Sequence, residues 1–146
     1  MKILLLALVM VLSGCVSTAP EYSNTLEIIG SAAESAPDGV EGEYTFKIQA
    51  VGKPKRTVYL NTELDYRDQR NVTIALHPRL AKQLLEQHGA DSETFFIGKS
   101  IRVNGEAKRA KIIFNSQGRP SGLYYYQTQI RLKDIDKIEI LETAEN

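Results

Sequence analysis

The loop Asp65–Asn71, with the sequence DYRDQRN, holds the densest cluster of side chains that could do chemistry. One interpretation is a ligand site, in which Arg67 and Arg70 grip an anion or a sugar and Tyr66 stacks on it. The other is a self-capped loop, in which Asp and Asn side chains bond nearby backbone N–H groups and Arg67 pairs with a neighbouring carboxylate. The residue types fit both interpretations.

A second cluster places basic and aromatic residues on either side of a turn-rich stretch. Its members are Lys108, Arg109, Lys111, Tyr124, Tyr125, Tyr126 and Arg131. Such a surface can bind sugars or single-stranded nucleic acid by stacking and charge. The same residues also suit an ordinary pair of β-strands, in which lysines protect the sheet edge from aggregation. Across both clusters, the candidate binding residues are Tyr66, Arg67, Arg70, Lys108, Lys111, Tyr124 and Tyr126.

The sequence contains no complete motif of a catalytic or metal centre. The GKS string at 98–100 has Glu93 where a P-loop needs its first glycine. His77 and His88 are too far apart to share an ion, at about 16 Å along a helix. EF-hand, GxSxG, HExxH and paired-cysteine patterns do not occur. We therefore expect a protein that is not an enzyme and has no metal and no cofactor.

The N-terminus carries chemistry of another kind, at Cys15. Lys2 gives a short positive start, residues 3–12 are an unbroken apolar run, and Ser13 and Gly14 are small. This layout is typical of a secretory signal with a small-residue cleavage site. The apolar run is too short for a membrane span, which takes about 20 residues. Because Cys15 is the only cysteine, an internal disulfide is excluded.

The string Leu12-Ser13-Gly14-Cys15 resembles the lipobox of bacterial lipoproteins. The resemblance implies cleavage before Cys15, a diacylglycerol on its thiol, and a further acyl chain, such as palmitate, on the new amino end. More than one acyl chain anchors a protein stably where a single chain does not. Val16 follows in place of the Asp that implies retention at the inner membrane. We therefore expect a protein anchored by lipid to the outer membrane and facing the periplasm.

Composition leaves room for one small domain behind a signal peptide at 1–14. The chain has 146 residues, and 18 basic residues balance 18 acidic ones, so it has no overall positive field for nucleic acid. Residues 15–42 are rich in Ser, Ala, Pro, Gly and Glu, which predicts a flexible tether with at most a short strand at Thr25–Gly30. We expect the domain at 43–141 and a tail at 142–146.

Hydrophobic periodicity predicts a mainly β domain with one helix. The expected strands are 44–50, 56–61, 72–76, 99–114, 123–132 and a short edge strand at 138–141, with a loop over 115–122. Pro78 and Gly89 predict the start and end of a helix over His77–His88. The expected core is Phe46, Ile48, Leu60, Ile74, Leu84, Ile101 and Val103.

This order suits a five-stranded OB-fold-like barrel with the helix between strands three and four. An SH3-like or other small barrel is the rival. Residues 108–126 exceed what either barrel needs, so we expect them to project as a hairpin.

Two segments resemble a small group of exported OB-fold-like domains with the patterns LNSE-x-DYRD-x-x-N and GK-x-I-x-V-x-G. The matching residues are Leu60, Asn61, Glu63, Asp65, Tyr66, Arg67, Asp68, Asn71, Gly98, Lys99, Ile101, Val103 and Gly105. Thr62 and Val72 replace the usual Ser and Phe, and the stretch 107–126 is longer than the usual connection. The group has no assigned activity, so the resemblance implies a fold and no reaction.

The resulting hypothesis is a membrane-anchored periplasmic lipoprotein that acts as a non-enzymatic binding or interaction module. Its partner would be an envelope protein or a glycan and not nucleic acid. The alternative is a structural envelope lipoprotein that docks on a protein partner through an exposed apolar patch. A hydrolase or nuclease ranks third, since it needs convergent carboxylates or histidines.

The anchor hypothesis predicts the behaviour of Cys15→Ser. Without the thiol there is no acylation, so an uncleaved or mis-sorted precursor should accumulate. Membrane fractionation and gel mobility check this. A variant of mature size that still fractionates with the membrane would contradict the hypothesis.

Overall fold

The structure is a computed structural model that describes residues 18–141; the expected signal peptide, Cys15 and the tail lie outside the described residues. Within this part the fold is mainly β, as predicted. The strands are β1 Val40–Lys47, β2 Ala50–Gly52, β3 Val58–Asn61, β4 Val72–Leu76, β5 Ser100–Ser116, β6 Arg119–Leu132 and β7 Ile138–Leu141. The helices are α1 Thr25–Ser35 and α2 Pro78–Gln87, with short 3-10 turns at Glu93–Phe96 and Ile135–Lys137. No helix in the described range has the length and apolarity to cross a membrane.

The strands form one sheet in the order β1-β5-β6-β4-β3-β2, and β7 pairs with β5. The two ends of this path, β1 and β2, are successive stretches of chain separated by Ile48 and Gln49. The Ile48 N–H donates to the Lys99 carbonyl at one end, and the Gln49 N–H donates to the Asn61 carbonyl at the other, both at 2.9 Å. The sheet has seven strands: the five of the expected barrel become six because the first expected strand divides here, and β7 is the short edge strand expected at 138–141.

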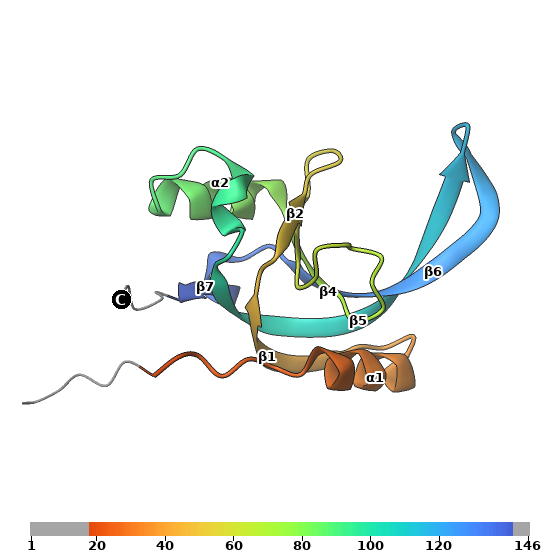
Figure 1. Ribbon diagram of the computed structural model, residues 1–146, viewed down its shortest axis with the longest axis horizontal. Coiled ribbons are helices and arrows are strands. Elements are labelled where there is room, and N and C mark those ends of the chain that lie inside the picture. The colour runs from red at the N-terminus through yellow and green to blue at the C-terminus, as the bar shows by residue number, and fades with distance from the viewer. Residues whose placement is uncertain (1–17, 142–146) are drawn as a thin grey trace, which may run out of the picture.

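The core lies inside the curve of the sheet, between two helices on opposite sides of it (Figure 1). All seven residues that the sequence predicted as core are buried. Helix α1 adds Ile28 to this cluster, and α2 adds Leu80 and Leu84. Burying such side chains is the main favourable contribution to folding, at about 1.5–3 kcal/mol for each fully buried large one.

Helix α1 replaces the short strand expected at Thr25–Gly30. The Asn24 side chain caps it by accepting a hydrogen bond from the Leu26 N–H at 3.1 Å. Ile28 and Ala32 lie one turn apart and are buried, and the helix contacts β5 and β1. The prediction of a strand was wrong because this cap and the buried helical face outweigh the local apolar pattern.

The domain also begins earlier than expected. Ser23 and Thr45 exchange two hydrogen bonds of 2.9 Å, and the Tyr22 and Ser100 hydroxyls are hydrogen-bonded at 2.7 Å. These bonds tie the approach to α1 onto β1 and β5. The flexible tether predicted over 15–42 is therefore wrong from Tyr22 onward.

Helix α2 confirms the sequence prediction. His77 caps it, since its Nδ1 accepts a hydrogen bond from the Arg79 N–H at 3.3 Å, and Pro78 occupies the first turn. Gly89 follows the helix with a φ of 62°, a conformation that glycine adopts without strain.

Strands β5 and β6 form a long hairpin that projects from the rest of the domain, as expected (Figure 1). The loop predicted over 115–122 shrinks to the turn at Gln117 and Gly118, whose φ values of 51° and 76° are both positive. Such turns match the right-handed twist of paired strands, so pairing continues almost to the tip. A register shift between Ile113 and Asn115 interrupts it.

The packing of α2 predicts the effect of Leu84→Ala. Leu84 is 2% exposed, so its truncation should lower the free energy of unfolding by about 2–5 kcal/mol. The neighbouring exposed residue Gln83 provides the control, because Gln83→Ala should change the free energy of unfolding by less than about 0.5 kcal/mol. Denaturant unfolding measures both. Equal, small effects would mean that α2 does not pack on the core.

Candidate functional site

A cleft of about 580 Å³ lies on the face of the sheet opposite the core. Asn61, Thr73 and Gln129 are cross-strand partners on β3, β4 and β6, so they share that face. Their neighbours Leu60, Ile74 and Ile130 point into the core, as side chains alternate along a strand. The residues that line the cleft are Gly52, Lys53, Pro54, Tyr59, Asn61, Tyr66, Thr73, Ile112, Tyr125, Gln127 and Gln129. Its volume is within the range of small-molecule sites, about 300–1,000 Å³.

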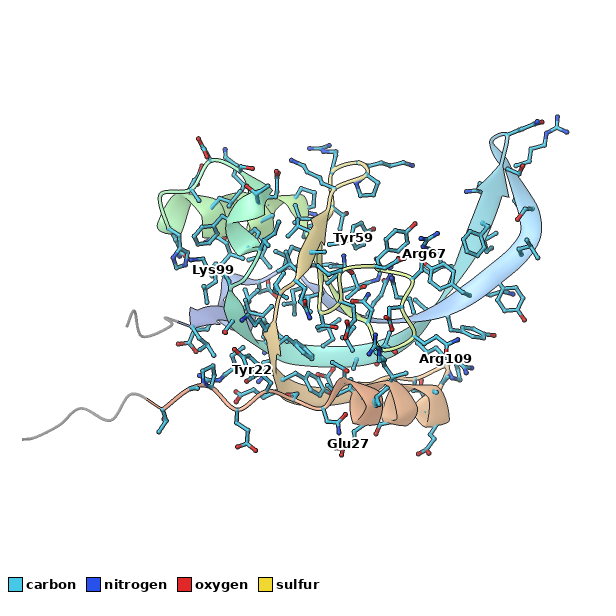
Figure 2. All side chains as sticks on the ribbon, viewed as in Figure 1. Tyr22, Glu27, Tyr59, Arg67, Lys99 and Arg109 are labelled. Atoms are coloured by element: carbon cyan, nitrogen blue, oxygen red, sulfur yellow. The ribbon has the colours of Figure 1, made fainter. Side chains whose placement is uncertain are left out.

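Three tyrosines from different segments contribute to the cleft. Tyr59 comes from β3 beneath the β2–β3 loop, Tyr66 from the loop after β3, and Tyr125 from the long hairpin. Figure 2 shows Tyr59 and Arg67 in the region between the two hairpins. The Tyr125 ring packs on Phe114, with 5.2 Å between ring centres, so the hairpin holds it in place.

The cleft floor carries a chain of hydrogen-bonded amides whose direction is fixed at one end. The Tyr66 carbonyl can only accept, so Gln127 must turn its Nε2 toward it, at 3.1 Å. The Oε1 of Gln127 then accepts from the Nε2 of Gln129, at 2.6 Å. This leaves the Oε1 of Gln129 buried without a hydrogen-bond partner in the described structure, on a residue only 5% exposed. Buried polar atoms are nearly always paired, so this acceptor is the unusual group of the cleft.

The buried side chain of Asn71 holds the Tyr66 loop against the sheet. Its Nδ2 donates to the Tyr66 carbonyl at 3.2 Å, to the Asn61 Oδ1 at 3.2 Å and to the Thr73 Oγ at 2.9 Å. Its Oδ1 accepts from the Glu63 N–H at 3.2 Å. One amide therefore fixes both the loop and the polar side of the cleft.

The rest of the Asp65–Asn71 loop is self-capped. The Asp65 carboxylate accepts from the Arg67 backbone N–H and binds the Arg67 guanidinium through two bonds of 2.9 and 3.0 Å. Asp68 and Arg70 repeat this arrangement, with bonds of 2.8 and 3.1 Å. The hydrogen bonds from Arg67 lower the pKa of Asp65, and those from Arg70 lower the pKa of Asp68 to about 2. Of the predicted trio, Tyr66 thus lines the cleft while both arginines bind their own aspartates.

The other predicted cluster lies on the opposite face of the hairpin. The Lys111 ammonium is 4.1 Å from the centre of the Tyr124 ring, and the Arg109 guanidinium is 4.3 Å from that of Tyr126. Figure 2 places Arg109 beside α1, and it is not among the residues that line the cleft. In these pairs the face of each tyrosine ring is in contact with a cation of the same chain. Such contacts fit the interpretation of an ordinary strand pair. Lys108 lies on the face of the hairpin that carries the cleft, and its ammonium is 4.0 Å from the Glu106 carboxylate.

Sequence reasoning missed most of the cleft. It did not select Tyr59, Asn61, Thr73, Gln127 or Gln129, and it grouped Tyr125 with the other hairpin tyrosines. One signal was present: the outward positions of β6 read Tyr125, Gln127, Gln129, which is aromatic and then uncharged polar. The contributions of β3 and β4 had no such signal, because their positions opposite β6 depend on the sheet order.

The cleft is electrically neutral. Lys53 is the one charged side chain among the described residues that line it, and it pairs with Glu93. The hydrogen bond from Lys53 lowers the pKa of the Glu93 carboxyl, which is therefore ionised near neutral pH. Burial raises the pKa of Tyr125, whose phenol therefore stays protonated. No group of three or more His, Cys, Asp or Glu residues in the range 18–141 is placed to hold a metal.

No protein-family model matches this chain, and no curated protein matches it. Among solved structures, the chain is similar to the aspartyl tRNA synthetase from Entamoeba histolytica, with 14% identity and a TM-score of 0.43. The similarity covers 95% of this chain and 25% of that protein, so the chain spans about a quarter of its length. A similarity of this strength identifies neither the fold nor the function.

The Asp68–Arg70 pair makes the loop sensitive to acid. The folded pKa of Asp68, about 2, is below its ordinary value of 3.8. The pair therefore stabilises the loop above about pH 4, and this contribution is lost as the pH falls toward 2. An NMR titration should give a carboxyl midpoint near 2 that rises in Arg70→Gln and stays unchanged in Arg79→Gln on α2. A midpoint near 3.8 in the wild type would contradict the pairing.

Proposed function

We propose that this chain is a non-enzymatic binding module, anchored by lipid to a bacterial envelope membrane, and that the cleft is its binding site. The observation that carries the proposal is a tyrosine-lined cleft whose lining includes Gln129, a residue with an unpaired, buried Oε1. An unpaired buried acceptor costs about 1–3 kcal/mol, a cost that a ligand able to donate a hydrogen bond would remove. The lipid anchor rests on the lipobox-like residues that end at Cys15.

We also propose that the domain is an OB-fold-like barrel. In support, β1 and β2 are consecutive in the chain and stand at the two ends of the strand order. The bent segment that they form together would therefore close the sheet into a barrel. The parallel β4–β6 pair and the position of α2 between β4 and β5 agree with that topology. In OB-folds, ligands bind on the outer sheet face between loops that correspond here to the β2–β3 loop and the long hairpin.

The chemistry of the lining favours binding over catalysis. Among the described residues that line the cleft, none is a carboxylate, histidine or thiol. Amides, hydroxyls and aromatic rings recognise a ligand by hydrogen bonds and stacking, and they are poor acids and bases near neutral pH. This set therefore supports recognition better than hydrolysis.

A second candidate function is docking on a protein partner through the long hairpin. Three apolar side chains near its end are well exposed: Ile113 at 50%, Phe114 at 40% and Leu123 at 67%. Residues 107–133 also hold six basic residues and no acidic one, although the whole chain is neutral. Such a surface would suit an acidic partner.

The alternation of side chains along β6 allows the two candidates to be tested with adjacent residues. Tyr125 faces the cleft, while Tyr124 lies on the opposite face with Lys111. The full-length chain would be cross-linked in its own envelope, and the material bound to wild type, Tyr125→Ala and Tyr124→Ala compared by mass spectrometry. We expect Tyr125→Ala to lose at least about tenfold in recovery, because it removes a stacking surface, and Tyr124→Ala to retain it.

Each outcome has a distinct meaning, provided that thermal midpoints show both variants folded. Loss in Tyr124→Ala alone would replace cleft binding with docking by the hairpin. Equal recovery from all three proteins would contradict the proposed function of the cleft.

A further inference from the structure

We infer that the ligand of the cleft is a neutral glycan; this rests on the proposed function, which assigns binding to the cleft. The structural observation is the combination of an uncharged amide and hydroxyl floor, an unpaired buried acceptor and three tyrosine side chains. Each part restricts the chemistry of the ligand.

The charge of the cleft lining argues against a polyanion. Nucleic acids are held largely by cations that replace the counterions of their phosphates. Here the lining offers Lys53 alone, and that ammonium pairs with Glu93. The nearby Arg67 guanidinium, which lies between the two hairpins, is held by the Asp65 carboxylate (Figure 2). A neutral ligand leaves both pairs intact.

The floor calls for a ligand that donates hydrogen bonds. The Oε1 of Gln129 can only accept, and the amide chain through Gln127 to the Tyr66 carbonyl prevents its reversal. A hydroxyl group donates and accepts at once, so it can pair with this oxygen and with the neighbouring polar groups. A glycan presents several hydroxyls on one ring face, which suits a row of amides and a threonine.

The strand ladders argue against a peptide. An extended peptide usually binds by adding its backbone to a free strand edge. In this sheet β3 pairs with β2 and β4, β4 pairs with β3 and β6, and β6 pairs with β4 and β5. At Asn61, Thr73 and Gln129 the strands are paired on both sides, so this part of the floor has no free edge and offers side chains alone. Further along, β6 from Arg119 to Gln127 pairs with β5 alone.

The tyrosines supply the apolar part of the site. Tyr59, Tyr66 and Tyr125 come from three segments and border the same cleft. A sugar ring has an apolar C–H face as well as its hydroxyls, and that face can pack on an aromatic ring. By contrast, Tyr124 and Tyr126 have their ring faces beside Lys111 and Arg109, which leaves them less suited to this role.

Binding of defined oligosaccharides to the detergent-solubilised full-length chain tests the inference. The probes are chitotetraose, cellotetraose and maltotetraose, with tetra-alanine and an oligothymidine as the peptide and nucleic acid arms. Tyrosine fluorescence can follow binding because the chain has no tryptophan. The side-chain amide signals of Gln127 and Gln129 in NMR spectra report whether the cleft is the site.

We expect saturable binding of at least one tetrasaccharide, with shifts of the Gln129 amide signal. Gln129→Met keeps the shape of the side chain and removes the acceptor, so it should weaken binding about tenfold or more. Its thermal midpoint should change little, because the unpaired Gln129 oxygen is removed while the Gln127 Oε1 loses its donor. The matched control Gln83→Met, on the exposed side of α2, should bind as the wild type does.

A second pair of variants keeps the test valid if Gln129→Met does not fold. Tyr59→Ala should weaken oligosaccharide binding, whereas Tyr124→Ala on the opposite face should not. Binding of the peptide or oligothymidine alone, no binding of any tetrasaccharide, or unchanged affinity in the folded cleft variants would overturn the glycan inference. If Tyr125→Ala still abolished recovery of envelope material, the proposed binding function would survive that result.

Discussion

The cleft depends on one buried side-chain amide, that of Asn71. It binds the Tyr66 carbonyl, the Asn61 side chain and the Thr73 hydroxyl, and so joins a surface loop to two strands. Buried amides are costly unless their hydrogen bonds are satisfied, so this arrangement strongly restricts the loop. The Tyr66 carbonyl in turn orients the two glutamines of β6. The direction of the whole polar floor thus follows from one packed group.

Because side chains alternate along its strands, the long hairpin carries different residue types on its two faces. Tyr125, Gln127 and Gln129 face the cleft, and Tyr124 and Tyr126 face the other way with their cations. A slip of one residue in the pairing of β5 with β6 would exchange the two sets. The core pair Ala107 and Ile130 at the base of the hairpin resists such a slip, because both side chains are fully buried.

Helix α1 changes the relation between the domain and its proposed anchor. Tyr22 is hydrogen-bonded to the domain, and six residues separate it from Cys15, fewer than the long tether suggested by composition. Such a stretch spans at most about 25 Å from Cys15 to Tyr22 when fully extended. If Cys15 is acylated as proposed, the domain is held close to the membrane.

The sequence by itself determined the elements whose signals are local. The pattern of apolar residues identified the core, Pro78 and Gly89 bounded α2, and the length of the stretch 108–126 indicated the projecting hairpin. It did not determine α1, because the burial of Ile28 and Ala32 depends on strands far along the chain. Nor did it assemble the cleft, since Tyr59, Thr73 and Gln129 come together only through the order β3-β4-β6. Spacing along one chain records which residues share a face of one strand, whereas the pairing of distant strands decides which faces become a site.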